Sequence, residues 1–206
     1  MDEIQYFNNI KIDIPYNAIL YRLGYKNRKT QLNKFEKKKI DIFIKEGFDL
    51  CEKKMVYRIY KKFLVAENKI KLSKNAIIKS KDIYNLLKNS SELVLMAATV
   101  GKKIIESRDF EIKQGNAAKA IIFDAVASEV VDSLLDWFEK YFGTQIRREN
   151  KFLTRRFSPG YGDLKLETQK IFYSLLNLKK LNVKITKKFI LLPEKTVTAI
   201  SGIEKI

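Results

Sequence analysis

The segment SELVLMAATVG, residues 91–101, restricts the fold of this chain more than any other stretch. Its apolar residues follow one another without alternation, and the run ends at a glycine. A strand with one solvated face alternates apolar and polar residues, whereas a strand covered on both faces is apolar throughout. The sequence therefore predicts a central strand at 91–101 that is buried on both faces.

Helix and strand patterns are mixed along the rest of the chain. Helix patterns cover residues 14–25, 31–54, 80–90, 102–112, 116–142 and 164–178, and strand patterns cover residues 56–65, 151–158, 183–186, 189–193 and 196–203. The two kinds do not alternate regularly, so an α+β fold is expected rather than a doubly wound one. No linker or repeat divides the chain, which predicts a single domain of residues 1–206 with a mainly helical N-terminal region, residues 1–55.

Composition excludes several kinds of site. The chain has no histidine and one cysteine, Cys51. Zinc sites and Cys/His nucleophiles are therefore excluded, and a general base would have to be another residue type. Cys51 is interpreted as a small core residue.

The chain carries 41 basic and 24 acidic residues, a net charge of +17. A surplus of this size attracts anionic partners, either nucleic acid or an acidic protein. The lysines are scattered, however, and arginine, which grips phosphate better, is the minority. A basic nucleic-acid-binding module stays an alternative, but nucleic acid is the less favoured partner.

The sequence favours a cytoplasmic protein. It contains no apolar run near the roughly 20 residues of a membrane-spanning helix. The first residues, MDEIQYFNNI, lack the basic start and apolar stretch of a signal peptide. The single cysteine agrees with a reducing compartment.

The segment RFSPGYGD, residues 156–163, has the composition of a binding loop. Ser158 to Tyr161 fit a type II turn with Gly160 at the position that needs positive φ. Asp163 is predicted to cap a helix starting near Leu164, where backbone N–H groups converge. Arg156 offers a two-pronged grip on a carboxylate or phosphate, and Tyr161 a flat ring with a hydroxyl. The alternative is a plain connection in which Arg156 pairs with a surface glutamate.

Five segments together resemble a known family. The spacing R-x-x-x-G-Y from Arg156 occurs with SPGYGD, and YRLGY, LMAATVG, FDAVASE and LLPEKTVTAISGI occur in the same order as in that family. From about residue 12 to its end, the chain resembles the reactivation domain of cobalamin-dependent methionine synthase, in its short free-standing form. The resemblance implies a mixed, largely antiparallel sheet with helices packed on it.

The resemblance also implies a function. Such a domain binds S-adenosylmethionine and presents its methyl group to cobalamin that has slipped into the inactive cob(II)alamin state, after an electron arrives from a flavodoxin-like donor. Carried over to this sequence, Arg156 would grip the cofactor's carboxylate, and Ser158, Gly160 and Tyr161 would supply loop contacts. The chain would then be an activation subunit of methionine synthase, not catalytic alone, or a reactivator of another corrinoid methyltransferase.

The chain departs from the family at one informative position. Longer members carry a histidine six residues after the loop tyrosine, where this chain has Glu167. Without any histidine, the chain offers no imidazole to cobalt, so a partner protein, the methionine synthase core, would have to bring the cobalamin.

A carboxylate in the helix pattern at 116–142 is the remaining candidate. Its buried stripe is predicted to comprise Ile122, Val126, Val130, Leu134, Trp137 and Tyr141. Glu129 lies at the edge of this stripe, whereas Asp124 points away. Glu129 either forms a salt bridge to a lysine or to Arg156, or, as the resemblance implies, contacts the ammonium or sulfonium of S-adenosylmethionine. The family also has a cofactor-contacting aspartate near its N-terminus, for which Asp13 and Asp41 are both candidates.

Overall fold

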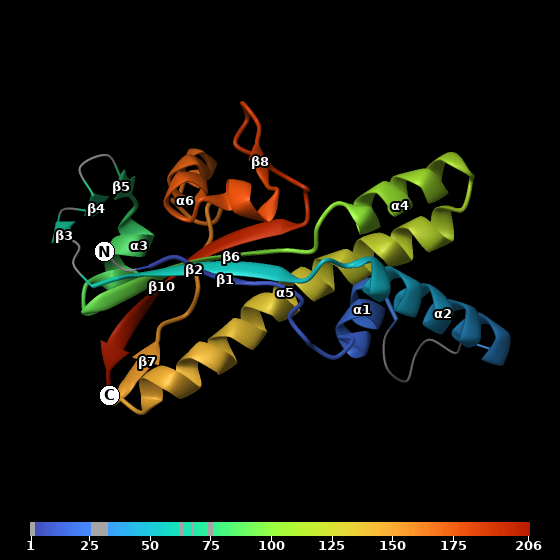
Figure 1. Ribbon diagram of the computed structural model, residues 1–206, viewed down its shortest axis with the longest axis horizontal. Helices are drawn as coiled ribbons and strands as arrows, with labels where there is room; N and C mark the ends of the chain where they lie inside the picture. Colours follow the sequence, from blue (N-terminus) through green and yellow to red (C-terminus); the bar gives the residue numbers. More distant parts are fainter. Residues whose placement is uncertain (1–2, 26–32, 62–63, 67, 74–75) are drawn as a thin grey trace.

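A five-stranded antiparallel sheet joins the beginning and the end of the chain (Figure 1). The computed structural model describes residues 3–25, 33–61, 64–66, 68–73 and 76–206. The strand order is β1 (Gln5–Phe7), β2 (Lys54–Tyr60), β6 (Glu92–Thr99), β10 (Thr196–Lys205) and β7 (Lys151–Leu153). The expected α+β class with a largely antiparallel sheet is confirmed.

The central strand β6 is buried on both faces, as its unbroken apolar sequence predicts. Alternate residues enter two separate cores. Val94, Met96 and Ala98 belong to the first, and Leu93, Leu95 and Ala97 to the second. All six are fully buried. The strand therefore divides the molecule into two packed layers.

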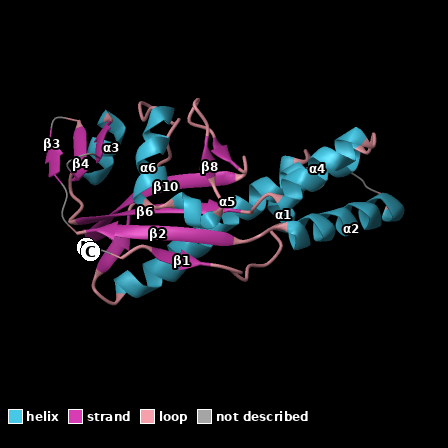
Figure 2. Cartoon of the chain, turned by 45° about the horizontal axis from the view of Figure 1, so that its top comes forward, coloured by secondary structure: helices cyan, strands magenta, loops and turns pink. Residues whose placement is uncertain are grey.

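The first layer is built on one long helix, α5 (Ala117–Arg147), which runs along one face of the sheet (Figures 1 and 2). Around its N-terminal half lie α1 (Tyr16–Arg22), α2 (Lys34–Leu50) and α4 (Lys103–Lys113). Further along α5, Phe138 and Phe142 pack against Tyr57 of β2. Both halves of the helix are thereby fixed to the sheet or to neighbouring helices.

The second layer covers the opposite face with shorter elements (Figure 2). It comprises α3 (Lys81–Leu87), the 3-10 turns η1 (Leu166–Thr168) and η2 (Leu178–Leu181), α6 (Gln169–Leu175), and two small sheets, β3 (Leu64–Ala66) with β4 (Lys69–Ser73) and β5 (Ala76–Lys79), and β8 (Lys184–Ile185) with β9 (Leu191–Leu192).

Several predicted boundaries differ from the structure. The helix predicted at 31–54 spans Lys34–Leu50, since Asn33 caps it and β2 begins at Lys54; residues 31 and 32 lie outside the described residues. The helix predicted to end at residue 142 continues to Arg147, and the one predicted at 164–178 is reduced to η1 and α6. The strand predicted at 151–158 pairs regularly only to Leu153.

Three strands were not predicted from the sequence. They are β1, in the region expected to be mainly helical, and β4 and β5. The strand predicted at 56–65 corresponds to β2, which ends at Tyr60. Among the described residues, no helix is both long and apolar enough to cross a membrane.

Candidate functional site

Residues 156 and 157 lie on opposite faces of the sheet edge. Phe157 exchanges two backbone hydrogen bonds of 2.9 Å with Ile200 of β10. Neighbouring residues of an extended chain point in opposite directions. Phe157 packs into the core of the second layer, and Arg156 reaches α5 in the first. The segment therefore places the arginine on one side of the sheet and continues into a loop on the other.

The tight turn predicted at Ser158–Tyr161 is present. Gly160 has a φ of +95°, and the Tyr161 amide donates to the Ser158 carbonyl over 3.2 Å. The Gly160 amide donates to the Leu164 carbonyl over 2.7 Å. Because both amides are bonded inside the loop, the prediction that free N–H groups converge here is wrong for these two. An anionic ligand would depend on other donors.

The prediction that Asp163 caps a helix starting at Leu164 is also wrong. Its carboxylate accepts hydrogen bonds from the amides of Lys81 at 2.6 Å and Asp82 at 3.3 Å, and from the Ser80 hydroxyl. These amides begin α3, and the first N–H groups of a helix have no partner within it. The hydrogen bonds, led by that from Ser80, lower the pKa of Asp163. The loop is thus fastened to α3, a contact across 82 residues of sequence.

Gly162 permits this close approach. Its φ is +52°, and a Cβ atom there would lie 2.2 Å from a carboxylate oxygen of Asp82 and 3.1 Å from the Phe157 ring. A side chain at this position would displace the loop from α3.

The loop residues predicted to contact a cofactor are accessible. Gly160 and Tyr161 are exposed and Ser158 is half-buried, while Pro159 between them is buried. The Tyr161 side chain keeps 69% of its surface exposed. A ligand can therefore reach the ring and the neighbouring backbone from solvent.

The Arg156 guanidinium lies against α5. Its Nη1 atom is 2.6 Å from the carboxylate of Asp136 and 3.1 Å from that of Glu139. Burial acts to lower the pKa of Arg156, but the two carboxylates outweigh it and raise the pKa. The pairing with Glu139 is the alternative that the sequence left open. Both ion pairs are formed by Nη1. Nε and Nη2 donate no hydrogen bond to a described residue, so these donors remain available to a ligand.

Glu129 lies half-buried at the edge of the apolar stripe of α5, as predicted. Its carboxylate accepts a hydrogen bond from Nε of Arg22 in α1. The salt bridge left open by the sequence is therefore made, but with Arg22 instead of a lysine or Arg156. The Arg22 side chain is nearly half exposed, so the partner of Glu129 lies at the surface.

The sequence did not single out Asp132. It lies close enough to Glu129 and Arg156 for both charges to affect its pKa. It follows Glu129 by one helical turn and precedes Asp136 by another. Burial and then the negative charge of Glu129 raise the pKa of Asp132, while Arg156 and Arg22 act to lower it. The signal in the sequence was the spacing of acids three or four residues apart, which puts them on one helix face. We call this row the acidic face of α5: Glu129, Asp132, Asp136 and Glu139.

Asp124, five residues before Glu129, lies off the acidic face and is firmly paired. It lies 2.9 Å from both Arg108 of α4 and Lys195, which precedes β10. Burial acts to raise the pKa of Asp124, but the two cations outweigh it and lower the pKa. Asp124 thus points away from the apolar stripe, as predicted, and toward the end of the sheet.

Of the two N-terminal candidates, Asp41 is held in place and Asp13 is exposed. The Tyr16 hydroxyl donates to Asp41, and burial together with this contact raises the pKa of Tyr16 to about 12. Asp13 precedes α1. The structure places neither residue in contact with Arg156 or Glu129.

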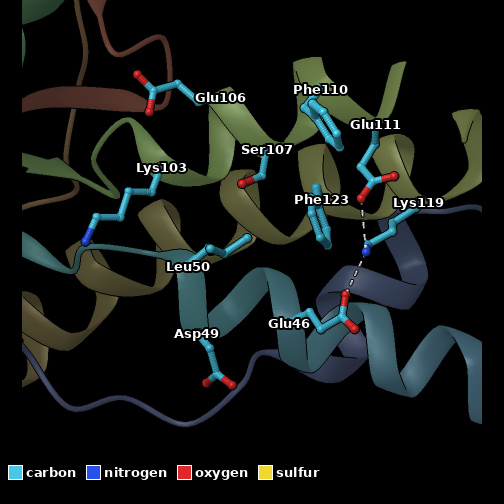
Figure 3. A pocket seen from close by; sticks show the side chains of 10 residues that line it. All are labelled: Glu46, Asp49, Leu50, Lys103, Glu106, Ser107, Phe110, Glu111, Lys119 and Phe123. Atoms are coloured by element: carbon cyan, nitrogen blue, oxygen red, sulfur yellow. Dashed lines mark ion pairs between the residues drawn. The ribbon is translucent and has the colours of Figure 1, made fainter. Parts of the chain in front are cut away.

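A cavity of about 700 Å³ lies between α2, α4 and α5, away from the predicted residues (Figure 3). Lys119 crosses it, 2.9 Å from Glu46 and 3.0 Å from Glu111. Within the described ranges, no cluster of His, Cys, Asp and Glu suits a metal ion. Cys51 is buried in the core, as interpreted, and burial raises the pKa of its thiol to about 12.

These features define a class of α+β domain, in which a long helix with an acidic face lies on an antiparallel sheet beside an arginine from the sheet edge. The fold is that of the MetH reactivation domain. The crystal structure of that domain bound to AdoHcy matches with a TM-score of 0.66 and 13% sequence identity, over 97% of this chain and 78% of that one. No protein-family model and no curated protein sequence matches the chain. The fold implied by the sequence resemblance is therefore confirmed.

Proposed function

We propose that the chain binds S-adenosylmethionine and presents its methyl group to a corrinoid held by a partner, as an activation subunit of cobalamin-dependent methionine synthase. The observation that carries the proposal is that Arg156, from the sheet edge, pairs with Asp136 and Glu139 on the same face of α5 that carries Glu129. The solved structure with the same fold was bound to AdoHcy, the molecule left when S-adenosylmethionine loses its methyl group. We further propose that residues 1–206 act as one domain.

The charges around Arg156 suit the charges of this ligand. S-adenosylmethionine carries a carboxylate, an ammonium and a sulfonium. The Nε and Nη2 donors of the Arg156 guanidinium fit the carboxylate. Glu129, with Asp132 beside it, is placed to attract the two cationic groups, because opposite charges favour each other in a partly desolvated site. The loop of Ser158, Gly160 and Tyr161 lies on the other side of the sheet edge from Arg156, so it contacts only a part of the ligand that passes around that edge.

The chain's own contribution to methyl transfer is binding and orientation. When bound, the cofactor supplies an electrophilic methyl group for displacement by a reduced cobalt centre. Alignment of the reacting groups is the main contribution that a protein makes to such a step. No acid or base has to move a proton, which suits a chain without histidine. The cobalamin comes with the partner, the methionine synthase core.

The electron donor is proposed to be a flavodoxin-like protein in the cytoplasm. Such donors are acidic, and the chain has a net charge of +17. Complementary charge speeds the encounter of two proteins and makes its rate sensitive to salt. Charge supports this partner without selecting it among acidic redox proteins.

Calorimetry with S-adenosylmethionine tests the binding claim. Wild type should release or absorb heat on titration, and Arg156→Ala should bind about tenfold more weakly or worse, since hydrogen bonds between charged groups contribute about 1.5–3 kcal/mol. Arg156→Lys keeps the charge but not the fork and should also weaken binding. Arg148→Ala, an exposed arginine at the end of α5, is the matched control and should bind as wild type. Absence of heat from wild type would end the proposal.

A spectroscopic assay tests the role in activation. The chain is mixed with a methionine synthase core loaded with cob(II)alamin, a reductant and S-adenosylmethionine. The visible spectrum should change to that of methylcobalamin only when the chain is present. A change seen only with a different corrinoid methyltransferase would replace the proposed partner. Binding to RNA that outcompetes the cofactor would favour the nucleic-acid alternative.

A further inference from the structure

A second cavity, of about 520 Å³, lies between the C-terminal half of α5 and the segment that begins with β7. Its volume falls within the range of small-ligand sites. Its lining is basic, with a short apolar wall: Glu139, Lys140, Gly143, Thr144, Arg147, Lys151, Phe152, Leu153, Thr154 and Arg155.

Three of the cations in this lining are without a counter-charge in the part of the chain that the structure describes. Lys140, Arg147 and Arg155 form no ion pair with any described residue, although acidic and basic residues are paired along most of α5. Lys151 is the exception, 2.8 Å from Glu149. The only acid in the lining, Glu139, is engaged by Arg156. The cavity therefore presents uncompensated positive charge.

Helix capping accounts for only some of this charge. Cations near the C-terminus of a helix interact favourably with its dipole, an effect limited to the last turn. Arg147 lies in that turn, but Lys140 lies earlier on α5 and Arg155 lies beyond β7. Two segments of the chain, α5 and the one that follows β7, thus bring their cations to one hollow.

The apolar wall gives the hollow a second property. Phe152 of β7 keeps 39% of its surface exposed, next to Leu153 at the cavity. An exposed ring beside arginines suits a ligand that combines an anion with a flat group, because a planar ring stacks on the phenyl face. Arginine in particular grips phosphate with two donors.

We propose that this cavity binds a small phosphorylated molecule with a planar ring, such as a nucleotide. Arg147 and Arg155 hold the phosphate, Lys140 adds charge, and Phe152 stacks on the ring. A small molecule is favoured over a nucleic-acid strand because Lys140, Arg147 and Arg155 line one bounded hollow together with an apolar wall. The site is separate from the proposed S-adenosylmethionine site and does not depend on it.

Titration calorimetry at low salt tests this site with three probes, namely pyrophosphate, ATP and adenosine. Pyrophosphate and ATP should bind, ATP more tightly because of the ring, and adenosine should bind weakest. Lys140→Gln with Arg147→Gln should weaken ATP and pyrophosphate about tenfold or more, the effect of losing charged hydrogen bonds. Arg148→Gln with Lys187→Gln removes the same charge from exposed positions outside the cavity and should leave binding unchanged. Thermal unfolding of each variant checks that it folds.

Three results would overturn the proposal. The first is no heat with either pyrophosphate or ATP. The second is an equal loss in the control pair, which would mean that only the overall field attracts the anion. The third is adenosine binding as well as ATP, or a single-stranded RNA oligonucleotide binding where ATP does not.

Discussion

The middle and the C-terminal end of α5 differ in how their charges are balanced. Before Glu139, the acids of α5 are compensated by cations from other elements, with Arg108 and Lys195 on Asp124, Arg22 on Glu129 and Arg156 on Asp136. Beyond Glu139 the sign reverses, and Lys140, Arg147 and Arg155 meet no acid among the described residues. Paired charges fix neighbouring elements to the helix, whereas unpaired charges remain available to a ligand.

Replacing Arg156 or its neighbour Arg155 by glutamate should give the largest test of this difference between the two regions of α5. Arg156→Glu would place a fourth carboxylate beside Asp132, Asp136 and Glu139 and should lower the free energy of unfolding by roughly 2 kcal/mol, because it removes a partly buried pair and adds repulsion. Arg155→Glu, at an exposed position without an ion pair, should change it by less than about 0.5 kcal/mol. Urea unfolding of both variants measures the difference.

Equal effects at the two positions would contradict the distinction. A loss in Arg155→Glu as large as that in Arg156→Glu would mean that Arg155 also stabilises the fold. A negligible loss in Arg156→Glu would mean that the acidic face does not need its arginine.

A smaller effect is expected from Asp132, whose contribution to the free energy of unfolding should depend on pH. Its pKa is raised above 3.8, by burial and then by the charge of Glu129, so the folded state holds the proton more tightly than the unfolded state. The carboxylate therefore costs stability above its folded pKa and costs nothing below its unfolded pKa. Asp132→Asn should raise the free energy of unfolding near pH 7 by less than about 1 kcal/mol, since the side chain is partly exposed.

The control for this prediction is the same variant in acid. At about pH 3 both states of wild type carry a protonated Asp132, so the gain from asparagine should vanish. Destabilisation near pH 7 would instead show that the attraction of Arg22 and Arg156 outweighs burial and repulsion.

Much of the framework was predictable because it depends on local patterns. The unbroken apolar run of β6, the apolar stripe of α5 up to Leu134 and the Ser80 cap of α3 each carry a signal within a short window. Tyr141, also predicted to belong to the buried stripe, is exposed, and Phe138 and Phe142 are buried instead. By contrast β4, in which only Ile70 and Leu72 are buried, is too short to reveal its alternation among lysines. Short strands depend on the neighbours they pair with, which a local pattern does not contain.

The candidate site was predictable in its residues but not in its contacts. The turn at Ser158–Tyr161 follows from Pro159 and Gly160 alone. The partners of Asp163, Arg156 and Glu129, however, come from α3, the middle of α5 and α1 respectively. Several carboxylates and cations compete for each partner, and only the packing of the layers decides between them.

The smallest effect should come from adding an acid to the unpaired end of α5. Thr144 is exposed, four residues after Lys140 and three before Arg147. Thr144→Glu creates pairs at helical spacing with both. The unfavourable interaction of the new carboxylate with the helix C-terminus offsets part of the gain, so the free energy of unfolding should rise by less than about 0.5 kcal/mol at low salt. Thr144→Gln, similar in size and uncharged, is the matched control. The difference between the two should disappear as salt is raised, because exposed pairs are screened.

The same pair of variants connects stability to binding. Lys140 and Arg147 have no acidic partner among the described residues, so Thr144→Glu should stabilise the helix. It should also reduce the affinity for pyrophosphate, because the new carboxylate pairs with these cations and repels the anion. Thr144→Gln should do neither. Equal stabilisation by both variants would reflect helix propensity alone. The new carboxylate would then have gained nothing from Lys140 and Arg147, and the difference between the two regions of α5 would not hold.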